Sequence, residues 1–102
     1  MEKNMPMTEA IFYILLAVRH PNHGYGIIGE VEELTSGRVV LGAGTLYGAL
    51  QTLEKKGFIE VYSADEGSRK KKEYIITKSG RSAFMDETKR LTELLENSKL
   101  MD

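Results

Sequence analysis

Apolar residues recur with the period of an α-helix in the middle of the chain, and turn signals stand on both sides of them. Leu46, Leu50 and Leu53 follow one another at intervals of four and three residues, which places them on one buried stripe. Gly57 comes directly after the last turn, where a left-handed cap residue commonly ends a helix. The pattern therefore predicts a helix over residues 44–56 that buries one face.

The opposite face of this predicted helix is polar but carries little charge. Its candidates for contact with DNA are Thr45, Tyr47, Gln51, Thr52 and Lys55. Hydroxyls, an amide and one cation suit the major groove, where base edges present donors, acceptors and thymine methyl groups. An ordinary amphipathic helix has the same pattern, so this face alone favours neither interpretation.

Two β-rich runs come directly after this helix. Residues 58–62 alternate apolar and polar side chains, and residues 72–76 form a second run after the turn-rich segment 63–68. A reading helix followed by a hairpin predicts an α+β, mostly helical fold, a winged helix-turn-helix. Basic residues gather near the hairpin tip, namely Arg69, Lys70, Lys71 and Lys72. They favour phosphate contacts, although charged hairpin tips also protect exposed strand edges.

The first predicted helix is unusually apolar. It runs from its N-cap Thr8 to Arg19, and residues 10–18 are apolar on every face. Such a helix has to be buried on more than one side. In so short a chain we expect another copy of the protein to cover its second side.

A shorter helix is predicted to begin near Tyr25 and to stop at Gly37. Its inward stripe is Ile27, Val31 and Leu34. Residues 39–41 then form either a brief strand that pairs with the hairpin or a buried connector.

A last helix is predicted to start at Thr77 or Ser79 and to reach Lys99. One seam along it contains Phe84, Leu91 and Leu95, with Thr88 and Ser98 as weaker members. Since nothing else in the chain remains to cover this seam, we expect a C-terminal dimerisation helix. The chain is accordingly divided into a winged-helix DNA-binding domain, residues 1–77, and a dimerisation helix, residues 78–102.

The first and last helices together are expected to close a homodimer. The candidate interface residues are Phe12, Leu15, Phe84, Thr88, Leu91 and Leu95. A single short domain leaves little room for a drug-sized cavity of about 300–1,000 Å³, so a small apolar effector is expected between the subunits. A fully packed interface without an effector is the alternative.

Composition bears on the attraction to nucleic acid, on disulfide and metal sites, and on the location of the protein. With 14 Lys and Arg against 15 Asp and Glu, the net charge of −1 gives no general attraction to nucleic acid, so the placement of charge matters more than its sum. The absence of cysteine excludes disulfides and thiolate metal sites. No apolar run approaches the roughly 20 residues that span a bilayer, and no signal peptide is evident, so we expect a cytoplasmic protein without membrane contact.

Two patterns resemble ligand-binding motifs but do not indicate a cofactor or metal site. Residues 24–29 match G-x-G-x-x-G, but that fingerprint works after a strand in a βαβ unit, and here a predicted helix and Pro21 precede it. His20 and His23 are too few for a zinc site. We therefore predict no cofactor and no metal, and since no nucleophile, base and acid can be grouped, no enzyme.

Three ordered stretches resemble the PadR family of winged-helix transcriptional regulators, in its short subfamily with a single C-terminal helix. They are residues 23–27, residues 44–59 and residues 69–81. The resemblance implies a homodimeric binder of double-stranded DNA, usually a repressor, relieved by a small molecule or another signal. A winged-helix module for protein–protein interaction without DNA binding is the alternative, because the fold also serves as an adaptor.

Overall fold

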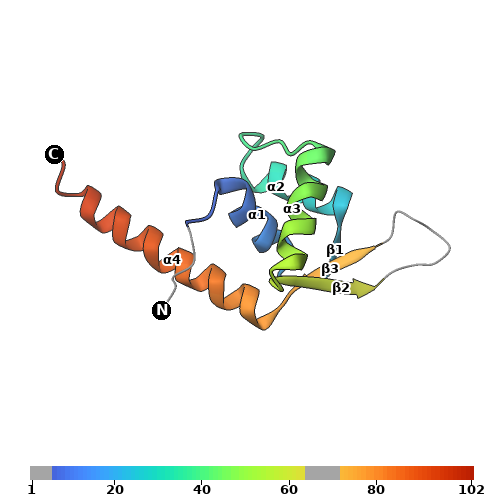
Figure 1. Ribbon diagram of the computed structural model, residues 1–102. Coiled ribbons are helices and arrows are strands. Elements are labelled where there is room, and N and C mark those ends of the chain that lie inside the picture. The colour runs from blue at the N-terminus through green and yellow to red at the C-terminus, as the bar shows by residue number, and fades with distance from the viewer. Residues whose placement is uncertain (1–5, 64–71) are drawn as a thin grey trace.

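The computed structural model describes residues 6–63 and 72–102 (Figure 1). Within this part of the chain the elements are α1 (Glu9–Ala17), β1 (Asn22–His23), α2 (Gly24–Leu34), α3 (Ala43–Lys55), β2 (Ile59–Ser63), β3 (Glu73–Ile76) and α4 (Lys78–Ser98). The first three helices lie together beside the β2–β3 hairpin, and α4 extends away from them (Figure 1). The predicted α+β, mostly helical winged-helix fold is confirmed.

The third strand of the small sheet is β1, which lies between α1 and α2 and was not predicted. All its pairs are antiparallel and the order is β1-β3-β2, with Asn22 opposite Tyr74. Residues 39–41 form no strand; Leu41 is buried in the core and Val39 packs against it. Of the two predicted alternatives the segment is therefore a connector, but it is buried only in part, because Val40 is 65% exposed.

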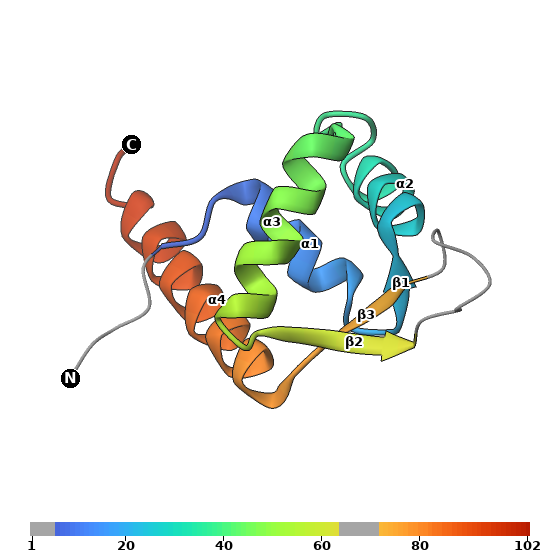
Figure 2. The same ribbon diagram turned by 45° about the vertical axis from the view of Figure 1, so that its right-hand side comes forward.

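Helix α1 lies at the centre of the fold. Its N-cap is Thr8, as predicted, whose Oγ1 accepts a hydrogen bond from the Ile11 N–H at 3.2 Å. Figure 2 shows α1 behind α3, with α2 on one side and α4 on the other, and α1 contacts both flanking helices. Every apolar side chain of α1 is buried or half-buried by the chain itself. The chain therefore covers most of this helix by itself, and contact of a second copy with its half-buried residues stays a prediction.

One interface candidate needs correction, and a second has a partner within the chain. Leu15 is 0% exposed and belongs to the core, so it lies on no outer surface. Phe84 of α4 stacks on Phe12 of α1 with ring centroids 4.5 Å apart. The first half of α4 thus has a partner within the chain, and only the part from Leu91 onward is exposed throughout.

The inward stripe of α2 is shorter than predicted. Ile27 and Val31 are fully buried, but Leu34 is 49% exposed. The helix ends at Leu34, and Ser36 and Gly37 turn the chain with positive φ angles of 52° and 81°. Leu34 consequently lies beside a polar pocket at the surface instead of over the core.

The start of α4 is fixed against the end of α3. Thr77 caps α4 by accepting from the Gly80 N–H, and its own hydroxyl donates to the Gly57 carbonyl at 2.6 Å. Gly80 comes so close to the chain after α3 that a Cβ there would stand 2.1 Å from the Phe58 carbonyl oxygen. This position requires glycine because the obstructing atom belongs to the backbone and cannot move aside as a side chain could.

We therefore expect Gly80→Ala to destabilise the fold by about 1–3 kcal/mol, the usual cost of overpacking a filled site. Gly29→Ala is the matched control, since Gly29 is also helical but has nothing within 4 Å of its added Cβ. This control should stabilise the fold by roughly 0.5–1 kcal/mol through helix propensity. Urea unfolding followed by circular dichroism at one protein concentration measures both. Equal effects of the two changes would contradict a close approach at Gly80.

Candidate nucleic-acid interface

Helix α3 has the two faces that its sequence predicts. Leu46, Leu50 and Leu53 are buried in the core. The polar candidates Thr45, Tyr47, Gln51, Thr52 and Lys55 are all exposed. The helix therefore presents hydroxyls, an amide and a cation to the outside while three leucines anchor it.

A hollow of about 390 Å³ separates α3 from the hairpin. Its lining consists of Tyr47, Gly48, Gln51 and Glu54 from α3 with Lys72 and Tyr74 from the hairpin. The Lys72 Nζ lies 5.8 Å from the centroid of the Tyr74 ring, which holds the ammonium group beside the helix by a cation–π contact. The fold thus brings Tyr47, Gln51 and Lys72 to one hollow.

The other predicted contacts are distributed along and beyond this helix. Gln51, Thr52, Glu54 and Lys55 line a second hollow of about 410 Å³. The Thr52 hydroxyl donates to the Gly48 carbonyl at 3.2 Å. Its oxygen can therefore still accept a hydrogen bond from a ligand, and its methyl group can make an apolar contact. Thr45 is exposed near the start of α3 and lines neither hollow. Arg69, Lys70 and Lys71 lie outside the described residues.

Sequence reasoning missed one charged residue on this face. Glu54 lines both hollows, and it forms no ion pair with another described residue. Its position three residues after Gln51 and seven after Tyr47 would have placed it on the same stripe. An unpaired carboxylate here opposes the approach of any phosphate, because the two charges repel each other.

Tyr47 also connects α3 to α2. A Cβ at Gly24 would stand 2.2 Å from the Tyr47 hydroxyl oxygen, so the first turn of α2 and the Tyr47 ring lie in close contact. A Cβ at Gly26 would similarly stand 2.1 Å from the Asn22 side-chain oxygen. His23 caps α2, its Nδ1 accepting from the Gly26 N–H. Gly24 and Gly26 therefore permit close packing at the start of α2.

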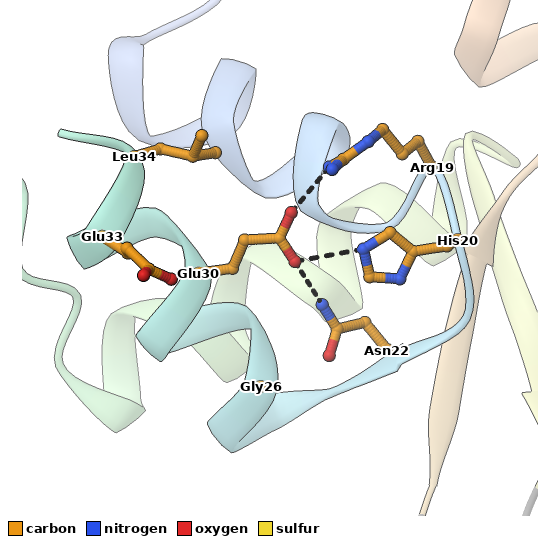
Figure 3. A pocket seen from close by; sticks show the side chains of 7 residues that line it. All are labelled: Arg19, His20, Asn22, Gly26, Glu30, Glu33 and Leu34. Atoms are coloured by element: carbon orange, nitrogen blue, oxygen red, sulfur yellow. Dashed lines mark hydrogen bonds and ion pairs between the residues drawn. The ribbon is translucent and has the colours of Figure 1, made fainter.

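A polar pocket of about 660 Å³ lies between α2 and the residues that follow α1 (Figure 3). Glu30 is its centre, accepting from Arg19 at 2.6 Å and from the Asn22 amide at 3.1 Å, with His20 Nε2 at 3.1 Å. Asn22 is buried and donates as well to the Ala17 carbonyl. These bonds hold the end of α1 to α2 and occupy the Glu30 carboxylate, so the cluster is structural.

Two further classes of feature are absent from residues 6–63 and 72–102. No group of three or more His, Cys, Asp or Glu side chains stands where it could hold a metal ion. No helix in these ranges is long and apolar enough to cross a membrane.

Known proteins resemble this chain in sequence and in fold. An uncharacterized protein from Lysinibacillus sphaericus is 33% identical over 82 residues, which make up 79% of this chain and 75% of the relative. A PadR family transcriptional regulator from Eggerthella lenta has a TM-score of 0.74 at 24% identity, over 90% of this chain and 80% of the other. A transcriptional regulator from Clostridium thermocellum has a TM-score of 0.69 at 25% identity, over 91% and 88% of the two chains.

The decisive match is to a family. Residues 13–86, most of the chain, match the Transcriptional regulator PadR-like family. The match includes α3 and the hairpin, and the solved structures above share the same arrangement of elements. The chain therefore belongs to the PadR-like family, whose members regulate transcription and are not enzymes.

Proposed function

We propose that this transcriptional regulator is a homodimer that binds double-stranded DNA in a sequence-specific way and acts as a repressor. The observation that carries the proposal is the exposed polar face of α3 with Lys72 held beside it on the hairpin. A helix with small polar groups enters the major groove, and a cation at its flank reaches the phosphates that border the groove.

The residues divide into two roles. On α3, Gln51 is positioned to pair with an adenine edge, and Thr45, Tyr47 and Thr52 to contact neighbouring bases or sugars. The cations Lys55 and Lys72 neutralise phosphates, together with the predicted contacts Arg69, Lys70 and Lys71.

The dimer rests on the second half of α4. All residues from Leu91 to the C-terminus are exposed, and this half of the helix leaves the body of the subunit (Figure 1). The proposed dimer seam therefore consists of Leu91 and Leu95, flanked by Thr88. We assign dimerisation to residues 78–102 and DNA binding to residues 1–77. Two copies of α3 related by a twofold axis suit half-sites about 34–36 Å apart, one turn of DNA.

The alternative of a protein–protein interaction module makes a different prediction about salt. A DNA binder gains affinity for random duplex as the salt concentration falls, because phosphate contacts release counterions. An adaptor without a DNA site shows no such gain. Repression itself is tested by transcription from a promoter that contains the bound sequence.

A pair of substitutions separates phosphate contact from base reading. Lys72→Gln should weaken binding to every duplex alike and reduce the log–log salt slope by about 0.9. Gln51→Ala should cost roughly 1–3 kcal/mol on a duplex selected by the wild-type protein from a random pool, with little loss on random duplex. Fluorescence anisotropy at several salt concentrations measures both, with Lys89→Gln on α4 as the charge-matched control. Equal loss of selectivity from both test variants would count against this division of roles.

Removing the Glu54 charge should strengthen DNA binding, whereas removing the Lys72 charge should weaken it. Glu54→Gln should raise the affinity for random duplex at low salt, because the substitution removes a negative charge from the face that approaches phosphates. The gain should shrink as added salt screens the interaction. The same anisotropy titration measures it, with Glu93→Gln as a control on α4. If Glu54→Gln leaves the affinity unchanged at every salt concentration, α3 does not face the duplex as proposed.

The seam on α4 can be tested by charge. Leu95 is 60% exposed in the single subunit, so Leu95→Asp should leave the subunit folded and yield a monomer in analytical ultracentrifugation. Leu100→Asp is the matched control, because Leu100 is 86% exposed and lies beyond the end of α4. A Leu95→Asp variant that still sediments as a dimer would show that the seam lies elsewhere.

A further inference from the structure

The first residue of α2 lies against a side chain on the polar face of α3. That residue is Gly24, and a Cβ added to it would stand 2.2 Å from the Tyr47 hydroxyl oxygen and 2.9 Å from the ring carbon that carries the hydroxyl. Both distances are shorter than an ordinary contact between non-bonded atoms. A side chain at position 24 and the present position of the Tyr47 ring therefore exclude each other.

The Tyr47 side chain is otherwise open to a ligand. It is 50% exposed, and it lines the hollow that Gln51 and Lys72 also line. In the part of the chain that the structure describes, no group forms a hydrogen bond with the Tyr47 hydroxyl. Packing therefore sets where the ring lies, and the hydroxyl keeps its capacity to donate and to accept.

The glycines of α2 differ in what an added methyl group would meet. At Gly29 it would meet nothing within 4 Å. At Gly26 it would stand 2.1 Å from the side-chain oxygen of Asn22, which is buried and donates to the Ala17 carbonyl at 3.0 Å, so this side chain cannot turn without breaking a bond. At Gly24 the obstacle is the far end of a half-exposed side chain, which has room to turn outward.

The three positions therefore have different expected roles. A methyl group at Gly29 is harmless, and one at Gly26 strains the buried junction between α1 and α2. A methyl group at Gly24 leaves the fold intact and moves Tyr47, which is a candidate contact with DNA. Tyrosine hydroxyls bond phosphate and sugar oxygens, and such contacts fix the register of a protein on the duplex.

We propose that Gly24 is a positioning residue for DNA binding, because its lack of a side chain lets the Tyr47 hydroxyl lie beside the first turn of α2. With a methyl group at position 24 the ring has to turn away from α2, and its hydroxyl leaves the place from which it contacts the duplex. The inference rests on the proposed function, since the position of Tyr47 matters to DNA only if α3 faces it.

A double-mutant cycle tests whether Gly24 acts through Tyr47. Gly24→Ala and Tyr47→Ala should each weaken binding to a duplex selected by the wild-type protein about tenfold, the order of one hydrogen bond to a charged group. In the Tyr47→Ala background, Gly24→Ala should have no further effect, because the ring through which it acts is gone. An undiminished effect in that background would overturn the proposal.

Gly29→Ala is the matched control, since it makes the same change in the same helix at a position with open space around it. It should leave the affinity for the selected duplex unchanged. If Gly29→Ala weakens binding as much as Gly24→Ala does, the effect belongs to α2 as a whole, and Gly24 has no special part in it.

Urea unfolding separates a displaced ring from a damaged fold. Gly24→Ala should lower the unfolding midpoint less than Gly26→Ala, because a half-exposed ring turns aside more easily than the bonded Asn22 side chain. A Gly24→Ala variant as unstable as Gly26→Ala would show that the Tyr47 ring cannot move away, which refutes the proposal.

The position of the ring can be followed without DNA. The chain has five tyrosines, so a protein with ¹³C-labelled tyrosine rings gives a small set of ring signals, and Tyr47→Phe identifies the one that matters. Gly24→Ala should shift the Tyr47 signal more than any other, and Gly29→Ala should not shift it. A wild-type protein that binds no duplex would refute the proposed function and the DNA role of Gly24 with it. DNA binding together with an unmoved Tyr47 signal in Gly24→Ala would refute the role of Gly24 alone.

Discussion

The burial of α1 is the constraint on which the rest of this structure depends. An apolar helix exposes too much surface to be stable in water, and each Ile, Leu or Val side chain fully removed from water contributes about 1.5–3 kcal/mol. The chain meets this demand alone, with α2 on one flank, α4 on the other and α3 in front. The two helices that in our proposal face DNA and form the dimer are therefore held by the same buried element. A change in the packing of α1 reaches both.

Local pattern predicted a large part of this arrangement. The stripe of leucines on α3, the cap Thr8, the start of the last helix at Thr77 or Ser79, and the hairpin after α3 all depend on residues within a few positions of one another. Helix and strand periodicities act over that range, so the sequence alone carries the information. The polar face of α3 was found for the same reason, although its role in DNA binding stays a proposal.

The features that sequence reasoning missed depend on contacts between distant residues. Asn22 pairs with Tyr74 to make the third strand, and Phe84 covers Phe12, neither of which leaves a local signal. Because α4 folds back over α1, the assumption that no part of the chain remained to cover the first helix was wrong, and Leu15 was misplaced with it. Glu54 is different: its spacing places it on the polar face of α3, but a carboxylate is not among the groups that attract phosphate, so the sequence pattern gave no reason to include it.

The hydrogen bond between Met7 and Glu87 joins residues 80 positions apart. Contacts of such long range close large loops and form late in folding. Until this contact forms, the flank of α1 that α4 covers is open to water. The newly made chain therefore passes through a stage with an uncovered apolar helix, the kind of surface that chaperones recognise.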